Sequence, residues 1–360
     1  MAIETPANSW QKLISRKSAV FGLAIIALAL LTGIFAYWIA ADGTPDANRM
    51  IVEIGGRKPG FSQQFFLLPK ENPAPKNNWI TKTLHGQPDL VQYLPITGYS
   101  IDGDVVTIKK YIDEDLTTTV HYPIAKLKSP VAANFVTRSF PLGTDKYGRD
   151  MLSRLLIGVR VSLLVGGIAM VLSLTIGLCL GALAGYYGGK TDNWIMWLIN
   201  VIWSIPTLLL VFAITLLLGK GFWQVFVAVG LTMWVNVARI VRGQLLGIRK
   251  LEYVEAARAL GYSDIRIIGK HILPNIMGPV LVVAAANFAS AIIIEAGLSF
   301  LGVGVQPPQP SWGGMIKENY NFIITNNPML ALAPGFAIML LVLAFNLLGN
   351  GIRDALDVRG

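Results

Sequence analysis

Long apolar segments constrain this chain more than any other feature. Crossing a bilayer as a helix takes about 20 mostly apolar residues, and the backbone of each span must satisfy its own hydrogen bonds. Six segments fit, each carrying at most one charged residue: 19–41, 159–184, 193–218, 222–239, 275–298 and 329–349. Only 14% of the residues are charged, against about 25% in soluble domains. We therefore predict an all-α polytopic membrane protein with six transmembrane helices.

The first segment, 19–41, is interpreted as a retained transmembrane helix. It is too long for the apolar core of a signal peptide, and no clear A-x-A cleavage site follows it. Lys12, Arg16 and Lys17 precede it. The positive-inside rule then places residues 1–18 in the cytoplasm.

The charges of two later loops agree with that orientation. Loop 240–274 contains six arginine and lysine residues, whereas Lys317 is the only one in loop 299–328. The rule predicts loop 240–274 and the C-terminal segment 351–360 on the cytoplasmic side. The net charge of +9 is then explained by cytoplasmic loops, and we expect no nucleic-acid partner.

Residues 42–140 differ in character, because Pro, Asn, Asp and Lys are frequent there. The sequences VVTIKKY (105–111) and LTTTVHY (116–122) are rich in the residues that favour strands. We predict a small β-containing extracytoplasmic insert. Its basic residues do not contradict this location, since long domains largely escape the positive-inside rule.

Residues 141–158 carry two pairs of opposite charges four residues apart. Asp145 precedes Arg149, and Asp150 precedes Arg154, a spacing that allows pairing along a helix. We predict an amphipathic helix on the outer membrane face that leads into the second span and also contains Gly143 and Gly148. A solvated helix start without a specific role is the alternative.

No catalytic or metal site is predicted. Gly189, Lys190 and Thr191 resemble the end of a phosphate-binding loop, but position 184 is alanine where the pattern needs glycine. Gly188–Lys190 lies between two apolar segments. These residues are interpreted as a tight turn between two spans. The three histidines, His85, His121 and His271, lie far apart in a chain with one cysteine, so we expect no metal ligation.

Loop 240–274 contains YVEAARALGYSDIRIIGKHILPN at 253–275. The pattern predicts two short helices separated at Gly261, which suits a helix C-terminus, and Pro274 as the start of the fifth span. Ala256, Ala257 and Leu260 would form one small apolar face, with Glu255 and Arg258 pointing elsewhere. Such a helix can dock into a groove of another protein. An amphipathic loop on lipid headgroups is the alternative.

This stretch resembles the EAA loop of ABC importer permeases. Glu255-Ala256-Ala257, Gly261 and Leu273-Pro274 have the family's spacing, and His271 with its neighbours is similar to the dipeptide/oligopeptide/nickel branch. Residues 141–163 resemble the C-type inner-membrane subunit of that branch, as do the following segments: GYYGGK at 185–190, EAGLSFLGVG at 295–304 and PPQPSWGGMI at 307–316. The resemblance is close over 140–360 and loose over 1–41, and insert 42–140 departs from it.

The resemblance implies a type I ABC importer permease fold with its core at 159–350, in the cytoplasmic (inner) membrane of a bacterium. It implies a coupling helix that docks on an ATPase and includes Arg258 and Leu260. The implied partners are a second homologous permease subunit in a heterodimer, two ABC ATPases and an extracytoplasmic substrate-binding protein. ATP and Mg would be used by the ATPases, and this chain would bind no cofactor. Di- or oligopeptides are the implied substrates; nickel and other small solutes remain open.

Four residues are candidates for a translocation path or gate: Glu295, Asn287, Ser204 and Pro206. Ionisable residues within a membrane are costly and often functional. A carboxylate that reaches the outer interface is the alternative for Glu295. Two other functions compete with the importer: an ATP-independent secondary transporter, and a membrane-anchored binding module centred on 42–140.

Overall fold

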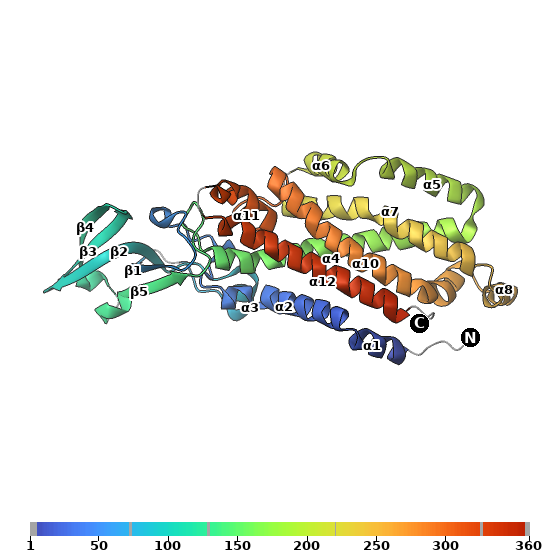
Figure 1. Cartoon of the computed structure of the whole chain (residues 1–360), viewed down its shortest axis with the longest axis horizontal. Coiled ribbons are helices and arrows are strands. Elements are labelled where there is room, and N and C mark those ends of the chain that lie inside the picture. Colours follow the sequence, from blue (N-terminus) through green and yellow to red (C-terminus); the bar gives the residue numbers. More distant parts are fainter. Residues whose placement is uncertain (1–5, 72–73, 128–129, 220, 325–326, 357–360) are drawn as a thin grey trace. The chain divides into compact units, whose positions relative to one another are not determined.

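The computed structural model describes residues 6–71, 74–127, 130–219, 221–324 and 327–356. These residues divide into two compact units. Unit 1 comprises 1–30, 162–306 and 337–360, and unit 2 comprises 31–161 and 307–336. Most of the described chain is helical (Figure 1).

The helices have the following bounds: α1 Pro6–Ser15, α2 Lys17–Ile39, α3 Trp79–His85, α4 Met151–Tyr187, α5 Gly189–Trp203, α6 Thr207–Leu218, α7 Phe222–Ile248, α8 Glu252–Ala259, α9 Asp264–Arg266, α10 Leu273–Leu301, α11 Trp312–Asn319 and α12 Met329–Leu356. A π-helical turn, Ile267–Ile272, joins α9 to α10. Short 3₁₀ turns lie at Pro45–Ala47, Val52–Ile54, Ile124–Lys126, Val131–Asn134 and Tyr320–Ile323.

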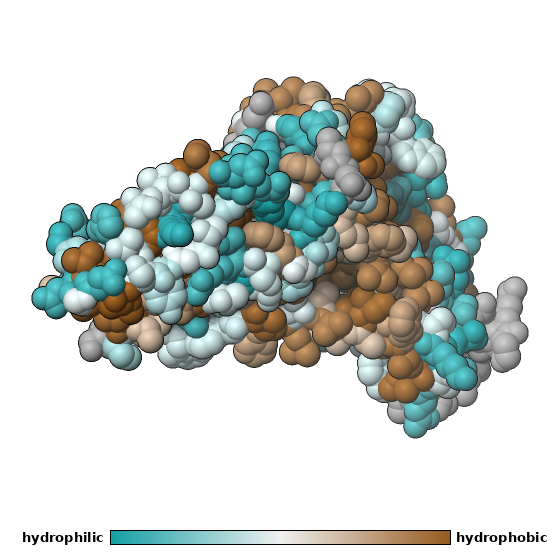
Figure 2. Space-filling view, turned by 60° about the vertical axis from the view of Figure 1, so that its left-hand side comes forward, coloured by the Kyte–Doolittle hydropathy of each residue, from teal (hydrophilic) through white to brown (hydrophobic). Residues whose placement is uncertain are grey.

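Among the described residues, five helices are long and apolar enough to cross a membrane: α2, α4, α7, α12 and the continuous helix 264–301. A sixth span results if α5 and α6 are counted together, although they meet at 90°. Hydrophobic side chains form much of the surface in Figure 2, and Leu28 and Leu217 are 65% and 86% exposed. This pattern suits helices whose solvent is lipid.

The predicted third span, 193–218, is not one continuous helix. Helix α5 ends at Trp203, and α6 begins at Thr207 after Pro206. Proline lacks a backbone N–H and clashes with the preceding turn, so the helix breaks there. Ser204 and Pro206 therefore lie at a sharp bend between two helices and not within one continuous helix.

Close packing of α4 on α7 forms part of the core of unit 1. A Cβ atom on Gly181 would lie 2.6 Å from the carbonyl oxygen of Ala238, and one on Gly185 would lie 2.6 Å from the Cβ of Leu245. Small residues at such spacing let two helix backbones approach closely, which is a common way to pack helices in membranes. The register of α4 against α7 is thereby fixed.

Two arginines hold the turn between α4 and α5. Arg242 lies on α7, and Arg249 follows the last residue of α7. Arg242 donates to both carboxylate oxygens of Asp192, at 2.5 and 2.7 Å. Arg249 donates to the carbonyl oxygens of Gly185 and Tyr186, at 3.0 and 3.1 Å, which satisfies acceptors at the end of α4. The structure places a tight turn at Gly188, as predicted, with a φ of 69°.

Unit 2 contains an antiparallel sheet in the order β4-β3-β2-β1-β5 (Figure 1). Its strands are β1 Phe61–Pro69, β2 Val91–Asp102, β3 Val105–Asp113, β4 Leu116–Pro123 and β5 Phe135–Phe140. The two strand-like segments of the sequence fall on β3 and β4. Apolar side chains pack on both faces, with Phe65 in one cluster and Phe66 in the other.

The amphipathic helix predicted over 141–158 is not present as such. Residues 141–150 form turns, with an isolated bridge between Thr144 and Asp150, and α4 begins only at Met151. Helix α4 then runs without a break to Tyr187. The predicted second span is therefore the main part of a longer helix.

Candidate functional site: the α8 surface and the 143–154 turn

Helix α8 is fixed to unit 1 by one side. Val254 and Ala257, three residues apart, are buried in a cluster that includes Leu245 of α7 and Ile267 and Ile272 of the π-helical turn. Residues three apart lie on the same face of a helix. The cluster therefore determines which side of α8 remains free.

The opposite side of α8 is exposed. Leu260 is 72% exposed and Tyr253 is 40% exposed, and Glu255, Ala256 and Arg258 are exposed as well. We predicted that Ala256, Ala257 and Leu260 share one exposed apolar face. This is wrong for Ala257, which is buried in the core. We call residues 253, 255, 256, 258 and 260 the α8 surface.

The end of α8 has a specific backbone geometry at Gly261. Its φ is +77°, its N–H donates to the carbonyl of Arg258 at 3.0 Å, and the N–H of Tyr262 donates to that of Ala257 at 3.2 Å. These two bonds form a Schellman motif, which favours glycine at this position. The predicted role of Gly261 as a helix terminator is present in the structure.

Substituting Gly261 with alanine is expected to loosen the end of α8 without unfolding the chain. No atom lies within 4 Å of the added Cβ, so only the positive φ is strained, at about 1 kcal/mol. Amide exchange of residues 260–263 should rise about fivefold in hydrogen–deuterium exchange mass spectrometry. Gly269→Ala is the control, because that position has free space without a positive φ; equal acceleration there would contradict the prediction.

The segment after Gly261 is tied to the end of α4. Asp264 accepts a hydrogen bond from the Tyr186 hydroxyl at 2.7 Å. The same hydroxyl interacts with Arg258 and holds the pKa of that guanidinium above its ordinary value. Tyr262 stacks on His271 with ring centroids 5.9 Å apart. His271 therefore supports the loop through packing.

Pro274 does not restart the chain into the fifth span, contrary to the prediction. One continuous helix runs from Asp264 to Leu301, with the π-helical turn inside it. Leu273 and Pro274 occupy the first turn of α10, directly after the π-helical turn.

The candidate path residues are mostly internal. Glu295 is fully buried, and its Oε1 accepts a hydrogen bond from the Ser299 hydroxyl at 2.6 Å. The carboxylate is therefore not exposed at the surface of the described residues. The Asn287 amide donates to the carbonyl of Met233 at 3.3 Å. The Asn287 bond joins α10 to α7, whereas the Glu295 bond stays within α10.

A pocket of about 330 Å³ lies where the α5–α6 break meets α7 and α10. Its polar lining comes from Thr207, Thr232, Asn236 and Ser290. The sequence analysis missed Thr232, Asn236 and Ser290 as candidates. Single polar residues within apolar spans were the available signal.

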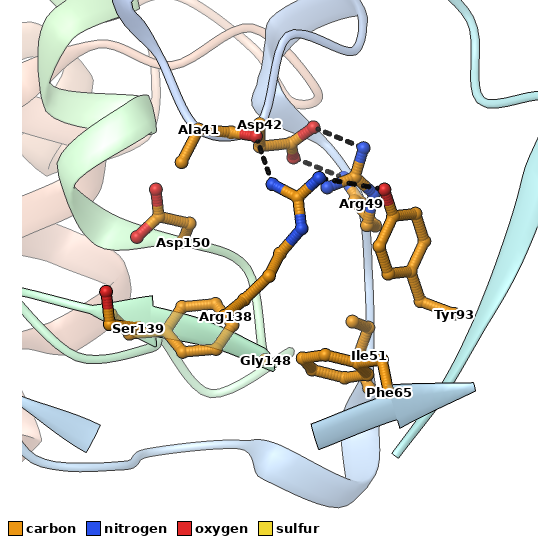
Figure 3. A pocket seen from close by; sticks show the side chains of 11 residues that line it. Ala41, Asp42, Arg49, Ile51, Phe65, Tyr93, Arg138, Ser139, Gly148 and Asp150 are labelled. Atoms are coloured by element: carbon orange, nitrogen blue, oxygen red, sulfur yellow. Dashed lines mark hydrogen bonds and ion pairs between the residues drawn. The ribbon is translucent and has the colours of Figure 1, made fainter. Parts of the chain in front are cut away.

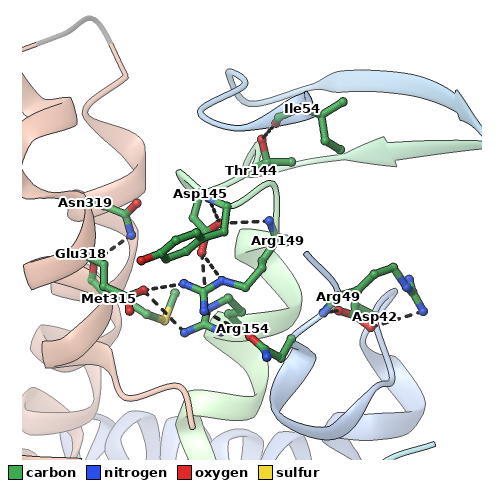
Figure 4. A network of polar contacts seen from close by, with 12 residues as sticks. Asp42, Arg49, Ile54, Thr144, Asp145, Arg149, Arg154, Met315, Glu318 and Asn319 are labelled. Atoms are coloured by element: carbon green, nitrogen blue, oxygen red, sulfur yellow. Dashed lines mark hydrogen bonds and ion pairs between the residues drawn. The ribbon is translucent and has the colours of Figure 1, made fainter. Parts of the chain in front are cut away.

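Unit 2 buries an ionic network at the start of α4 (Figure 4). Arg149 donates to Asp145 and to Glu318, at 2.6 Å each, and Arg154 lies 3.9 and 3.8 Å from the same two carboxylates. The Asp145, Arg149 and Arg154 side chains are at most 3% exposed. Glu318 of α11 was not predicted, since it lies 169 residues from Arg149.

The predicted pairing of Asp150 with Arg154 is wrong. Asp150 accepts from the backbone N–H of Ser153 at 3.1 Å and also from its hydroxyl. An aspartate in this position satisfies a free N–H at the helix start. Burial raises the pKa of Asp150.

Gly143 and Gly148 let the turns at 141–150 approach the insert. Their φ values are +74° and +72°. A Cβ on Gly143 would overlap the carbonyl oxygen of Arg57, and one on Gly148 would overlap that of Ile51. The turn is thus built around the backbone of residues 51–57.

Two arginines make further contacts in the insert, and Arg138 joins its two ends (Figure 3). Arg138 donates to the carbonyl of Ala41 at 2.7 Å and to the Tyr93 hydroxyl at 3.0 Å. Arg49 donates to both oxygens of Asp89, at 2.7 and 2.5 Å. Within the described part of the chain, no cluster of three or more His, Cys, Asp or Glu side chains could hold a metal ion.

Residues 177–359 match the family described as "Binding-protein-dependent transport system inner membrane component". The chain is 44% identical over 216 residues to the glutathione transport system permease protein GsiD of Pectobacterium atrosepticum, covering 60% of this chain and 71% of that protein. It is 43% identical over 215 residues to the dipeptide transport system permease protein DppC of Bacillus subtilis, covering 60% and 67%.

The oligopeptide transport system permease protein OppC of Bacillus subtilis is 41% identical over 215 residues, covering 60% of this chain and 70% of that protein. Among solved structures, an inward-facing MetNI methionine ABC transporter aligns with a TM-score of 0.47 at 22% identity, covering 56% of this chain and 97% of that chain. The family match covers the α8 surface and the pocket described above. This chain therefore belongs to the family of binding-protein-dependent transport system inner membrane components, and it is a permease of that class.

Proposed function

We propose that this permease serves an ATP-driven importer of di- or oligopeptides and that the α8 surface docks on the importer's ATPase. The single observation that carries the docking role is that α8 is buried on one side and exposed on the other. Val254 and Ala257 fix it to the core, and Leu260 projects at 72% exposure. An apolar residue flanked by Glu255 and Arg258 suits a groove in a partner protein.

Transport would proceed by alternating access. Partner ATPases would bind and hydrolyse ATP with Mg, and α8 would move with them. Because α8 packs on α7 and on the helix 264–301, its displacement would be passed to two spans. The importer would also contain a second homologous permease and an extracytoplasmic substrate-binding protein.

We infer six spans, with the bent α5–α6 pair crossing once. Both chain ends and α8 would then lie in the cytoplasm of a bacterium, and insert 42–140 outside its inner membrane. Residue Glu295 with Asn287, and the bend at Ser204 and Pro206, would control the path, with the pocket near Asn236 as part of it. Nickel or another small solute remains the alternative cargo. The peptide assignment is supported by the dipeptide and oligopeptide relatives.

Adding positive charge to the α8 surface is expected to release the ATPase. We would purify the tagged chain from its native host in mild detergent and quantify co-purifying ATPases by mass spectrometry. Glu255→Arg combined with Leu260→Arg should reduce them at least about tenfold, because about 1.4 kcal/mol of lost contact suffices. Both positions are exposed, so the fold should be retained.

Leu116→Arg on β4 is the matched control, since Leu116 is also exposed, at 56%. It should keep the ATPases. Undiminished ATPase with the α8 variant would exclude this surface as the docking site. Absence of any ATPase from the wild-type preparation would argue against the importer assembly itself.

A further inference from the structure

We propose that α3 is an interfacial helix that binds the surface of the lipid bilayer beside α2. Helix α3, Trp79–His85, belongs to the insert and has no buried residue. Trp79, Ile80 and Leu84 are 71%, 52% and 53% exposed. Three large apolar side chains on one short helix need a partner, and the surroundings of α3 identify lipid.

The composition of α3 is amphipathic. At 100° per residue, Trp79, Ile80 and Leu84 occupy one side together with Thr83, whose hydroxyl is bonded to Trp38 of α2. Thr81, Lys82 and His85 occupy the other side. Tryptophan is enriched at the interface between membrane and water, because its ring is apolar and its N–H is polar. An apolar side with basic residues opposite is the pattern of helices that lie in the plane of the membrane.

Contacts within unit 2 hold α3 against the end of α2 (Figure 1). The Trp38 indole N–H donates to the Thr83 hydroxyl at 2.9 Å, and the Lys82 ammonium lies 3.7 Å from the centre of the Trp38 ring. Arg160 of α4 donates to the carbonyls of Thr83 and Leu84, at 3.0 and 3.1 Å. These bonds fix α3 at the point where the apolar sequence of α2 ends.

The lipid-facing side of α2 continues to α3. Near its end, α2 buries Ala36 and Tyr37 in a cluster with Ala47 and Ile157. Its other side exposes large apolar residues at helical spacing: Leu31, Ile34, Phe35, Trp38 and Ile39, each 48–59% exposed. In a membrane span this side is in contact with lipid. Since Trp38 belongs to it and contacts α3, the apolar side chains of α3 extend the same surface.

Basic side chains lie next to α3, where the phosphate headgroups of the bilayer would be. Lys76 is exposed just before α3, Lys82 lies on the helix, and Arg160 contacts the carbonyls of Thr83 and Leu84. Long basic side chains at the end of a span reach the headgroup region. The proposal requires only that α2 spans the membrane. It does not depend on the importer role, although the topology proposed above would make this the outer leaflet.

The test uses the full chain in lipid nanodiscs with an environment-sensitive fluorophore on single cysteines. The chain has one cysteine, so Cys179→Ala gives a suitable background. Labels at Trp79→Cys and Leu84→Cys should emit at shorter wavelength and be quenched several-fold more by headgroup-labelled nitroxide lipid than a label at Leu116→Cys. Phe35→Cys gives the lipid reference, and His85→Cys reports the opposite side of α3.

Labels at 79 and 84 that resemble the one at 116 would overturn the proposal. So would a blue shift that needs other transporter subunits, because a protein would then cover α3. Since each label replaces an exposed residue, loss of folding is not expected, and a monodisperse elution profile checks it. A second measurement is protease cleavage of the insert in nanodiscs. It should accelerate for Trp79→Ser with Leu84→Ser but not for Leu116→Ser; equal rates would count against the anchor.

Discussion

Alanine in place of Gly148 is expected to destabilise unit 2 by at least about 3 kcal/mol, through strain and overlap together. Its φ is +72°, and the added Cβ would overlap the carbonyl oxygen of Ile51. The backbones at Gly148 and Ile51 cannot easily move apart, because the Ile51 N–H donates to the carbonyl of Tyr147 at 3.0 Å. The measurement is the fraction of monodisperse protein that remains after heating in detergent.

Gly60→Ala separates strain from overlap. Gly60 has a similar φ of +82°, but nothing lies within 4 Å of its added Cβ. This variant should lose only about 1 kcal/mol, the cost of a left-handed backbone without glycine. If both variants lost the same stability, close approach to Ile51 would not be the cause.

Asp145→Asn is expected to cost about 3–5 kcal/mol, because it leaves a buried positive charge without compensation. The network holds two arginines and two carboxylates, so its charges balance in the wild type. Asparagine can still accept from the backbone N–H of Arg149, which Asp145 does at 3.0 Å. The loss would therefore report charge more than shape, and heating in detergent measures it.

The exposed ion pair of Arg57 with Glu114 is the control. Its atoms are 2.5 Å apart, but the Glu114 side chain is 73% exposed. Glu114→Gln should change stability by less than about 1 kcal/mol, since surface pairs are weak. A loss from Asp145→Asn as small as this would mean that water reaches the network.

The apolar pattern predicted where the spans lie but not where their helices end. Segment 159–184 lies within α4, which is longer at both ends. Segment 222–239 lies within α7, which continues to Ile248. Hydropathy reports the lipid-exposed length, whereas a helix continues into polar sequence as long as its backbone bonds are satisfied. Arg242 was assigned to a loop, yet it lies on α7 and pairs with Asp192.

The largest error concerns residues 141–150. Opposite charges four apart favour a helix, and Asp145 does contact Arg149. The contact forms across a turn, however, because Gly143 and Gly148 adopt positive φ to fit around residues 51–57. The positive φ values are explained by the contact with residues 51–57, and these residues are remote in sequence.

Strands β1, β2 and β5 were not identified for related reasons. Strand β2 contains Pro95 and Gly98, which usually interrupt strands, and its register shifts between Ile96 and Gly98. Strand β1 lacks clean alternation, since Phe65 and Phe66 are both buried on opposite faces. At the candidate site, the terminating role of Gly261 was predictable from local chemistry, whereas the inward direction of Ala257 depends on the core beneath α8.

The π-helical turn Ile267–Ile272 has a consequence for length variation in this protein. Its bonds close five residues apart, so it accommodates one residue more than an α-helical turn would. Deleting Gly269 would convert the segment to regular α-helix and rotate everything before it by about 100° about the axis of α10. The direction in which α8 faces therefore depends on the number of residues in this turn. Deleting a single codon here would redirect α8 without changing the sequence of α8 itself.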